Sequence, residues 1–449
     1  MTREITFTSD TYAALVAHLF DGPEERAALL FCGRVVGPTR RRLLVREMVP
    51  INAEALLRQE RFALRVDGRF FVPHVKRARA EGWSLVFVHS HPFDGGAFFS
   101  ETDLEGEKEL REFWHTRAPG RPHATLVLSP SGFAANWLEP EEEAVPIGRL
   151  RILGRSLTIL ERSASQHGRD EHDRQIRAFG ERTQFHLGSA SVAIVGLGGI
   201  GSLVSAALAR LGVGAFQLWD GDKIEVSNLS RVAGSAPADV NLQRSKVAVA
   251  ARLIRSINPR ADVSTHFERL HFGSTKALAD VDYVFCCVDT HTVRAYLNRH
   301  ARTHLTPVFN LGSRITGDPA GIYGAVDFLV PDGECLVCAR KVDALRVAQE
   351  QLSDDEAKIH EARGYLDTSA PEPAVISLNM AVVGIAVTQF LQYLSGSQID
   401  SALVLDLTHS AIRRHQSSSR PCPECDGSLV AVGDLADIAS RLPLAEGVN

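Results

Sequence analysis

Two histidines and a downstream aspartate have the residue types and the spacing of a metal site. Residues 88–103 read V-H-S-H-P-F-D-G-G-A-F-F-S-E-T-D, with His89 and His91 at the end of an apolar run. Residues two apart in a strand project to the same side, so both imidazoles could bind one ion. Asp103 follows a Gly-Gly turn, at the predicted start of a helix. Two imidazoles and one carboxylate leave a fourth zinc position open, which is the arrangement of a catalytic site.

A zinc site that activates water also needs a carboxylate that is not a metal ligand, because a general base must take up a proton. Glu25 stands at the entrance of a predicted apolar strand, residues 27–32, and best matches this role. Glu24 beside it and Glu47 in the next predicted strand are the alternatives.

The same stretch resembles the JAMM (MPN-type) metalloproteases, whose pattern is a distant Glu, then H-S-H-P, seven residues and S-x-x-D. The seven-residue spacing before Ser100 meets that pattern without gaps. Members of the family are isopeptidases that remove ubiquitin or similar modifiers, and some bacterial ones trim small β-grasp sulfur carriers. The resemblance implies a catalytic Zn²⁺ held by His89, His91 and Asp103, with Glu25 as the base and Ser100 steadying the water or the oxyanion.

A glycine-rich loop, G-L-G-G-I-G at residues 196–201, follows a short apolar strand and precedes an Ala/Leu-rich helix. Glycines let the backbone approach a phosphate, and the helix start offers free N–H groups. The sequence D-G-D at residues 220–222 ends the next predicted strand, where an acidic residue can accept hydrogen bonds from a ribose. These features predict a nucleotide site, which NAD-dependent dehydrogenases and ATP-using enzymes share. The glycines expected at the nucleotide are Gly196, Gly198, Gly199 and Gly201.

Three further polar residues favour ATP over a nicotinamide cofactor. Arg231 ends V-S-N-L-S-R, Lys246 lies at the start of the next amphipathic helix, and Asp289 ends another buried strand. Cations suit the β- and γ-phosphates of ATP, and a carboxylate at a strand end suits Mg²⁺. A nicotinamide site needs neither, so the sequence predicts a site for ATP and Mg²⁺.

Residues 165–430 resemble the ThiF/MoeB and ubiquitin-activating enzyme family, because D-R-Q, G-x-G-G-I-G, D-x-D, S-N-L-x-R, a lysine and a strand-end aspartate follow in the family's order. The family adenylates the C-terminal glycine of a ubiquitin-like protein and releases pyrophosphate. Val232 departs from the family's usual Gln. The resemblance implies that Asp222 binds the ribose, that Asn228, Arg231 and Lys246 contact phosphates, that Asp289 holds Mg²⁺, that Asp220 has a cofactor-binding or structural role, and that Arg174 reaches the opposite subunit of a homodimer.

Four of the seven cysteines form two C-x-x-C pairs, Cys335 with Cys338 and Cys422 with Cys425. Four thiolates make the closed tetrahedral site of a structural Zn²⁺. The ThiF-like family also splits its zinc ligands across the fold in this way. Redox-active pairs are the alternative reading of the same spacing.

No cysteine lies between residues 338 and 422, although conjugating members of the family carry a thioester cysteine near the crossover loop, which residues 340–373 resemble. The remaining thiols, Cys32, Cys286 and Cys287, fall in predicted strands and are expected in the core. The sequence therefore predicts an enzyme that stops at the acyl-adenylate. A conjugating enzyme with its own thiol, or a sulfurtransferase, would then take over the acyl group.

The elements that must position these residues follow from the hydrophobic pattern, which predicts an α/β protein of two main units. We expect a JAMM/MPN mixed α/β domain at residues 1–146 and a linker or connecting helix at 147–164. A Rossmann-like ThiF/MoeB adenylating domain with a structural zinc site follows at 165–430, and a C-terminal tail at 431–449. Strands at residues 191–195 and 215–219 and a helix at 202–211 surround the glycine loop.

Composition places the chain among soluble globular proteins, with 45% hydrophobic and 23% charged residues. A net charge of −5 argues against a general nucleic-acid binder. The N-terminus has no apolar signal segment, and the apolar residues 374–393 include Ser, Asn, Thr and Gln, as in a buried helix. We therefore expect a cytoplasmic protein that contacts neither membrane nor nucleic acid.

These expectations combine into a bifunctional enzyme that adenylates a ubiquitin-like β-grasp protein and also cuts that protein or its conjugates with zinc. The first alternative is sulfur-carrier metabolism, in which the adenylate is thiolated and the peptidase releases the carrier. A second alternative is a scaffold with one inactive half. A dehydrogenase is the most distant hypothesis.

Overall fold

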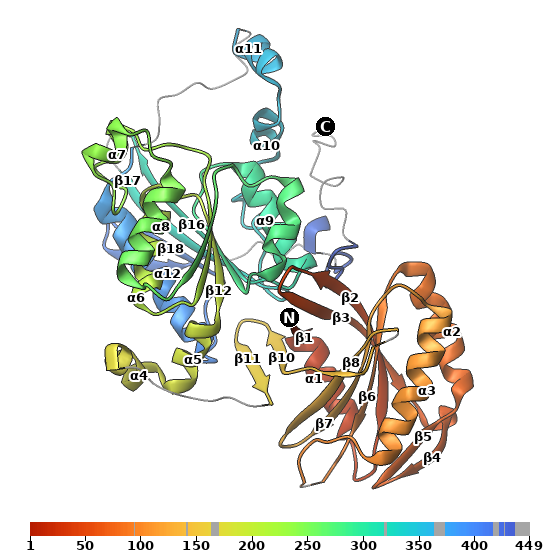
Figure 1. The fold of residues 1–449 in the computed structure, drawn as a ribbon. Helices are drawn as coiled ribbons and strands as arrows, with labels where there is room; N and C mark the ends of the chain where they lie inside the picture. Colours follow the sequence, from red (N-terminus) through yellow and green to blue (C-terminus); the bar gives the residue numbers. More distant parts are fainter. Residues whose placement is uncertain are drawn as a thin grey trace.

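The computed structural model describes residues 1–93, 95–140, 142–162, 170–317, 321–362, 373–415, 422–425 and 427–435. Their strands form a nine-stranded sheet in the N-terminal unit, an eight-stranded sheet in the C-terminal unit and a separate two-stranded hairpin (Figure 1). Each large sheet has helices packed on it, so the mixed α/β class predicted from the sequence is confirmed.

The sheet of the N-terminal unit runs in the order β11-β10-β1-β3-β2-β6-β7-β8-β9. Helix α1 (Ser9–Leu19) packs on one face, where Phe7 and Leu15 are fully buried. Helices α2 (Gly68–Glu81) and α3 (Glu101–Arg117) cover the other face around Phe71 and Trp114. The strands are β1 (Thr2–Thr8), β2 (Ala27–Val36), β3 (Arg40–Ile51), β6 (Ser84–Ser90), β7 (His123–Ser129), β8 (Gly132–Leu138), β9 (Val145–Pro146), β10 (Arg149–Leu153) and β11 (Leu157–Glu161).

A small hairpin, β4 (Leu56–Glu60) and β5 (Ala63–Val66), follows the short helix η1 (Ala53–Ala55) and pairs only with itself among the described strands. Helix α2 begins directly after it, because the Asp67 side chain accepts a hydrogen bond from the Arg69 amide. The helix ends at Gly82, whose φ of 82° lies in the left-handed region that glycine tolerates best.

The sheet of the C-terminal unit runs in the order β14-β13-β12-β15-β16-β17-β18-β19. The five strands β14, β13, β12, β15 and β16 are parallel. Strands β17, β18 and β19 are antiparallel to their neighbours. After β12 the chain builds β13 and β14 on one side and then returns to place β15 on the other. Ligands bind at such a switch point, outside the carboxyl ends of the strands.

The bounds of these elements agree closely with several sequence predictions. The strands are β12 (Ser191–Val195), β13 (Ala215–Trp219), β14 (Asp262–His266), β15 (Tyr283–Cys286), β16 (Val308–Thr316), β17 (Gly321–Leu329), β18 (Ala402–Asp406) and β19 (Ala411–Arg414). The helices are α4 (Asp173–Phe179), α5 (Glu181–Ser189), α6 (Gly199–Arg210), α7 (Pro237–Asn241), α8 (Lys246–Ile257), α9 (His291–Thr303), α10 (Ala344–Glu350), α11 (Asp354–Ala362) and α12 (Ile376–Leu394), with short turns η2 (Asp170–His172), η3 (Val226–Asn228), η4 (Phe272–Asp280) and η5 (Pro423–Cys425).

Helix α12 is long and apolar enough to pass a test for a membrane span, but half of the tested window is buried inside the protein. It packs against α6 and β17, and Val382, Ala386 and Phe390 are fully buried. The core helix of a soluble protein passes the same test. The packing matches the buried helix predicted for residues 374–393.

The linker or connecting helix predicted at residues 147–164 is wrong for the described residues up to 162. Strands β10 and β11 form a hairpin there, and β10 pairs in parallel with β1. Most side chains of the hairpin are buried, among them Leu150, Ile152 and Leu153 of β10 and Leu157 and Ile159 of β11. Because β10 pairs with β1 and β11 pairs with β10, the hairpin extends the N-terminal sheet as far as Glu161.

The start of the predicted C-terminal tail packs between the two units. The Ala431 amide donates to the Arg302 carbonyl at 3.0 Å, and the Asp434 amide donates to the Arg34 carbonyl at 2.8 Å. Gly33 faces this segment so closely that a Cβ there would collide with the Ala431 carbonyl. Residues 436–449 and the part of the predicted crossover loop at 363–372 lie outside the described residues.

Candidate functional site

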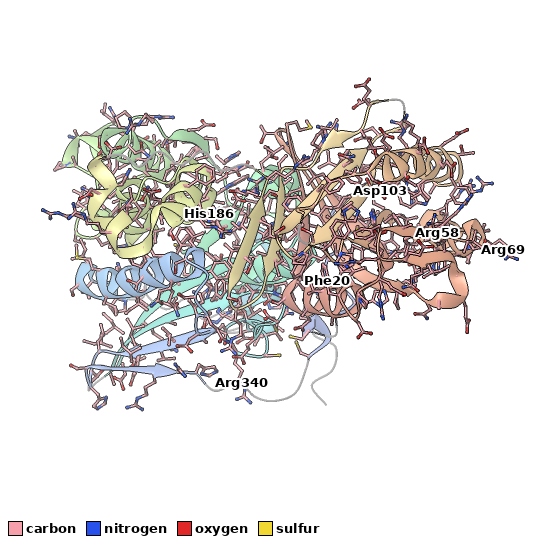
Figure 2. All side chains as sticks on the ribbon, turned by 90° about the horizontal axis from the view of Figure 1, so that it is seen from below. Phe20, Arg58, Arg69, Asp103, His186 and Arg340 are labelled. Carbon is pink, nitrogen blue, oxygen red and sulfur yellow. The ribbon has the colours of Figure 1, made fainter. Side chains whose placement is uncertain are left out.

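The two predicted zinc-binding histidines lie at the carboxyl end of β6. His89 belongs to the strand, and His91 follows it, held by a hydrogen bond from its amide to the Leu128 carbonyl at 2.8 Å. Asp103 projects from the first turn of α3, and Figure 2 labels it within the N-terminal unit. Its Oδ1 lies 3.2 Å from His89 Nε2, and its Oδ2 lies 3.6 Å from His91 Nε2. The structure therefore brings together the three side chains that the sequence predicts as ligands.

The geometry and chemistry of this triad fit a zinc ion. One donor atom from each of the three side chains lies within 4.8 Å of the others. His89 Nε2 is buried and makes no hydrogen bond, although it faces the other two donors. Burial alone would raise the pKa of Asp103, but the two imidazoles and the Ser100 amide more than offset burial and hold that pKa well below its usual range. An ionised carboxylate beside two imidazoles is the donor set of an open zinc site.

Ser100 is the N-cap of α3 and binds Asp103. Its hydroxyl donates to Asp103 Oδ2 at 2.7 Å, and its amide donates to the same oxygen at 2.8 Å. The Asp103 amide in turn donates to the Ser100 hydroxyl, which completes a capping box. The sequence assigned Ser100 a role toward the water or oxyanion, and that role stays a prediction. The structure shows in addition that Ser100 positions the carboxylate of Asp103.

Of the three candidate base residues, Glu25 is the one at the triad. It is 5% exposed, and its Oε1 lies 3.9 Å from His91 Nε2. Burial raises the pKa of Glu25 to about 7, with His91 opposing and Asp103 adding to the effect. Glu24 is exposed, and Glu47 is held by Arg77 through two hydrogen bonds of 2.8 and 2.7 Å. The geometry thus favours Glu25.

The glycine loop connects β12 to α6 at the carboxyl edge of the parallel strands. Val195, Trp219 and Cys286 are paired in register, so the loops that follow them meet at this edge. Gly196 has a φ of 87°, which favours glycine. A Cβ at Gly201 would collide with the Gly196 carbonyl. The predicted phosphate loop therefore stands at the switch point of the sheet, with α6 starting at Gly199.

Asp220 supports this loop from within the protein. Its Oδ2 accepts a hydrogen bond from the Leu197 amide at 2.7 Å, and its Oδ1 accepts one from the Asp222 amide at 2.8 Å. Because both carboxylate oxygens bind loop amides, the geometry favours the structural role among the two that the sequence allowed.

The charged residues predicted at the nucleotide gather around the same edge. Lys246 Nζ lies 2.8 Å from Asp222 Oδ2, and its amide donates to the Asp222 carbonyl at 3.0 Å. The hydrogen bond from Lys246 and the nearby charges lower the pKa of Asp222, outweighing partial burial. Asp289 is exposed between β15 and α9. Lys246 and Asp222 thus form an ion pair with each other, and a nucleotide bound here would contact both side chains of that pair.

Asn228 and Arg231 come from the turn after β13. Asn228 is buried, and its side-chain oxygen accepts a hydrogen bond from the Glu225 amide at 3.3 Å. Arg231 Nη1 donates to the Ser227 carbonyl at 2.7 Å. Arg174 is exposed on α4. The contacts of Asn228 shape its own turn, and the phosphate roles of Asn228, Arg231 and Arg174 stay predictions.

Asn379 is a polar residue of the site that the sequence analysis did not single out. It is 2% exposed on α12, and its side-chain oxygen accepts a hydrogen bond from the Ser313 hydroxyl at 3.1 Å. A Cβ at Gly199 would collide with its amide nitrogen, so it packs on the first turn of α6. The sequence signal that could have identified Asn379 is a single Asn within an otherwise apolar stretch of helix.

The four cysteines of the two C-x-x-C pairs meet in one cluster. Cys335 Sγ lies 3.5 Å from Cys422 Sγ, Cys338 Sγ lies 3.7 Å from Cys425 Sγ, and the Cys422 and Cys425 sulfurs are 3.8 Å apart. Disulfide sulfurs would be about 2 Å apart. Four sulfurs around one zinc at about 2.3 Å each are about 3.8 Å apart, so the cluster fits a structural Zn²⁺.

Comparison with known proteins identifies the larger unit. A model of the ThiF family matches residues 172–427, which is more than half of the chain. The chain belongs to the ThiF family. The N-terminal unit matches a model of prokaryotic homologs of the JAB domain at residues 8–131. The chain is therefore a fusion of a JAB-like unit and a ThiF unit.

Curated relatives of the ThiF unit are named ubiquitin-like modifier-activating enzyme 5. The protein of Drosophila ananassae is 28% identical over 251 residues, which cover 53% of this chain and 58% of that protein. The protein of Drosophila willistoni is 31% identical over 163 residues, covering 33% of this chain and 38% of that protein. The match thus spans less than two thirds of the length of these relatives.

Solved structures similar to the chain include E. coli MccB with ATP and PaaA. The former is 19% identical with a TM-score of 0.44, and the match covers 58% of this chain and 76% of that one. The latter is 23% identical with a TM-score of 0.43, covering 57% and 76%.

The three cysteines outside the cluster lie in strands or directly after them. Cys32 and Cys286 are fully buried, and Cys287 follows the end of β15 in the ThiF unit. Burial raises the pKa of Cys286 to about 11 and raises the pKa values of Cys32 and Cys287 as well. Thiols with raised pKa values are poor nucleophiles at neutral pH.

Proposed function

We propose that this chain adenylates the C-terminal glycine of a ubiquitin-like β-grasp protein and that its JAB-like unit cuts the same protein, or its conjugates, with zinc. The observation that carries the proposal is the joint presence of two sites in one chain. One is the triad with Glu25 beside it, and the other is the ThiF loop with Lys246, Asp222 and Asp289 at its edge. The names of the curated relatives support a ubiquitin-like substrate.

In the adenylation step, the C-terminal carboxylate of the substrate attacks the α-phosphate of ATP and pyrophosphate leaves. The amides at the start of α6 would bind phosphate oxygens, with Arg231 and Lys246 neutralising their charge. Asp222 sits beside Lys246 and would accept hydrogen bonds from the ribose. Asp289 would hold Mg²⁺, which supplies charge neutralisation when bound. The main task of the protein is to position and neutralise, so no cysteine is needed.

In the peptidase step, Glu25 would take a proton from the attacking water and pass it to the leaving amine. His89, His91 and Asp103 would hold Zn²⁺, which acidifies water and polarises a carbonyl when bound. Ser100 fixes Asp103 through two hydrogen bonds to one carboxylate oxygen. Glu25 lies 3.9 Å from the imidazole of His91, so its carboxylate would lie beside the attacking water.

ATP–pyrophosphate exchange tests the adenylation half. The full chain, with Mg²⁺ and a β-grasp protein ending in Gly-Gly, should exchange label between pyrophosphate and ATP. Asp289→Ala should lower the exchange rate about a hundredfold or more, because it removes the proposed ligand of the Mg²⁺ that neutralises the phosphates of ATP. Asp262→Ala is the matched control, because Asp262 is exposed at the start of β14. Exchange that is unaffected by Asp289→Ala would sink the proposed role.

The proposal has two versions, which differ in the molecule that receives the acyl group from the acyl-adenylate. The sequence has no cysteine between residues 338 and 422, and burial raises the pKa values of Cys286 and Cys287. In this proposal a thiol of another protein or a sulfide donor therefore receives the acyl group. A conjugating enzyme would form a thioester with it, whereas a sulfurtransferase would leave a C-terminal thiocarboxylate, and mass spectrometry of the β-grasp protein separates the two products.

We further propose that the enzyme works as a homodimer in the cytoplasm. The exposure of Arg174 on α4 supports the dimer, because the resemblance to the activating-enzyme family assigns this arginine to the opposite subunit. A scaffold with one inactive half is the competing hypothesis, and zinc binding without cleavage of any modifier fusion would support it.

A further inference from the structure

An aromatic cluster adjoins the candidate zinc triad. The ring of Phe93 stacks on the His91 imidazole with 5.0 Å between centroids. Phe98 meets the same imidazole edge-on at 5.2 Å, and Phe62 packs on Phe93 at 5.0 Å. The three phenyl rings, which we call the aromatic wall, are therefore continuous with a residue of the triad.

Part of the aromatic wall faces solvent. Phe62 is 68% exposed and Phe98 is 48% exposed. Burying an apolar side chain is favourable, and contiguous exposed apolar groups commonly mark binding surfaces. Phe93 is only partly exposed and connects Phe62 to His91, whereas Phe98 contacts His91 directly.

The hairpin that carries Phe62 is fixed to the backbone of Glu25. The Glu25 amide donates to the Glu60 carbonyl at 3.0 Å, and the Gln59 side-chain amide donates to the Glu25 carbonyl at 3.2 Å. Phe62 stands in the turn between β4 and β5. The position of Phe62 in the aromatic wall is therefore set by the same contacts that hold the backbone of the candidate base.

We propose that Phe62, Phe93 and Phe98 form a subsite that binds a large apolar side chain of the polypeptide substrate, in a residue close to the cleaved bond. The inference rests on the proposed peptidase function. The occupant is a substrate residue because the aromatic wall begins at His91, so whatever covers it lies beside the triad. A substrate with only small or charged residues near the cleaved bond would leave the phenyl rings in water.

Hydroxamates, which bind zinc without being cleaved, test the subsite without an identified substrate. The probes are acetohydroxamate and the hydroxamates of N-acetyl-Phe-Gly-Gly and N-acetyl-Ala-Gly-Gly, which keep the Gly-Gly of the proposed substrate, titrated calorimetrically into the zinc-loaded full chain. The phenylalanyl probe should bind about tenfold more tightly than the alanyl probe, as expected for one apolar group in a pocket. Phe62→Ala should remove most of this preference. Phe267→Ala is the matched control, because Phe267 is 53% exposed on the ThiF unit.

A second variant, Phe98→Ala, guards against a disturbed hairpin, since Phe98 lies outside β4 and β5 and should also reduce the preference. Equal binding of the two peptide probes by the wild-type chain would overturn the subsite, and so would a preference that survives both alanine variants. Failure of the proposed function looks different: the wild-type chain would then bind no zinc at the triad, or acetohydroxamate would not bind to the zinc-loaded chain.

Discussion

At the scale of single residues, burial and pairing distinguish three carboxyl groups that lie near one another in the sequence or on adjacent strands. Glu25 is buried beside His91, whereas Glu47 is paired with Arg77 and Glu24 is exposed. Pairing with Arg77 lowers the pKa of Glu47, whereas burial raises that of Glu25. A general base must lie within reach of the proton that it takes up, so the position of Glu25 beside the triad suits the task best.

Glu25→Gln should abolish zinc-dependent cleavage of a modifier fusion while leaving zinc bound. The amide cannot take up the proton of the water, and a loss of about a hundredfold to ten-thousandfold in kcat/KM is expected. The ligands His89, His91 and Asp103 are unchanged, so metal analysis should still find zinc at the triad. Glu24→Gln is the matched control and should cleave normally. Retained cleavage in Glu25→Gln together with its loss in Glu24→Gln or Glu47→Gln would assign the base elsewhere.

Residue spacing predicted the members of the candidate sites but not the contacts that support them. His89, His91 and Asp103 lie close in sequence, so strand alternation and a turn suffice to predict that they meet. Gln59 supports Glu25 from 34 residues away, and Asn379 packs on a loop that precedes it by more than a hundred residues. Such contacts depend on the tertiary fold, and nothing local in the sequence indicates them.

At the scale of elements, helix α9 shows why polar sequence does not always mean exposure. Its Asn298, Arg299 and Arg302 are buried. Arg299 binds Glu424 inside the cysteine segment, and Arg302 donates to the carbonyls of Pro331 and Gly333. The sequence analysis assigned no helix here, and the partners that allow Arg299 and Arg302 to be buried come from distant parts of the chain. Strands β12 and β13, which are apolar and locally determined, were predicted with their observed bounds.

The cysteine cluster is only a few residues along the chain from residues 430–434, the segment that packs between the two units. Cys425 ends η5, and residues 430–434 come a few positions later in the chain. The Gly433 amide donates a hydrogen bond to the Thr303 carbonyl of α9, and the Asp434 amide donates one to the Arg34 carbonyl of β2. The Val36 amide also donates to Asp434 Oδ2 at 2.9 Å. A zinc ion in the cluster would therefore help to hold the JAB-like unit on the ThiF unit.

Cys422→Ser should release the cluster zinc and accelerate hydrogen exchange at the amides of Val36, Gly433 and Asp434. The reason is that the segment loses its anchor at the cluster, so its hydrogen bonds open more often. His91→Ala is the matched control, because it disturbs the other candidate zinc site and should leave these amides protected. Unchanged protection in Cys422→Ser, with zinc loss established by metal analysis, would show that the segment is held without the metal.

At the scale of the whole molecule, the two units share a buried cluster of ionic groups. Arg40 of β3 binds Asp282 of the ThiF unit through hydrogen bonds of 2.6 and 2.9 Å. Glu4 binds Arg149 at 2.6 Å, and Arg151 lies 3.2 Å from Asp282. Breaking a buried pair leaves an uncompensated charge, which costs about 3–5 kcal/mol. The relative placement of the units thus depends on these carboxyl groups staying ionised.

Acid should weaken this ionic cluster at a pH set by Glu4, which lies in the N-terminal part of the cluster. Burial alone would raise the pKa of Glu4, but Arg149 and the neighbouring arginines hold it at about 2, below its ordinary value of 4.5. A lowered folded-state pKa gives a stabilisation that is complete above about pH 4.5 and is lost as the pH falls toward 2. Urea unfolding between pH 6 and 3 should therefore show a falling free energy of unfolding.

Glu4→Gln separates this group from the buried histidines. Burial also lowers the pKa of His300, to about 3. The unfolded chain therefore takes up a proton at this histidine below pH 6.5 while the folded chain does not, and this too lowers the free energy of unfolding as the pH falls. The variant should be less stable at pH 6 and should lose less on acidification below pH 4.5 than the wild-type chain does. An identical acid dependence in Glu4→Gln would assign the effect to other groups.

The most direct test of the central claim gives both sites the same substrate. The measurement is ATP–pyrophosphate exchange with a β-grasp protein supplied either as a precursor with residues beyond Gly-Gly or in mature form. We predict that the wild-type chain exchanges label with both forms, because the JAB-like unit trims the precursor first. His91→Ala should exchange only with the mature form. Equal exchange of the precursor by His91→Ala and wild type, or no exchange with the mature form, would contradict a shared substrate.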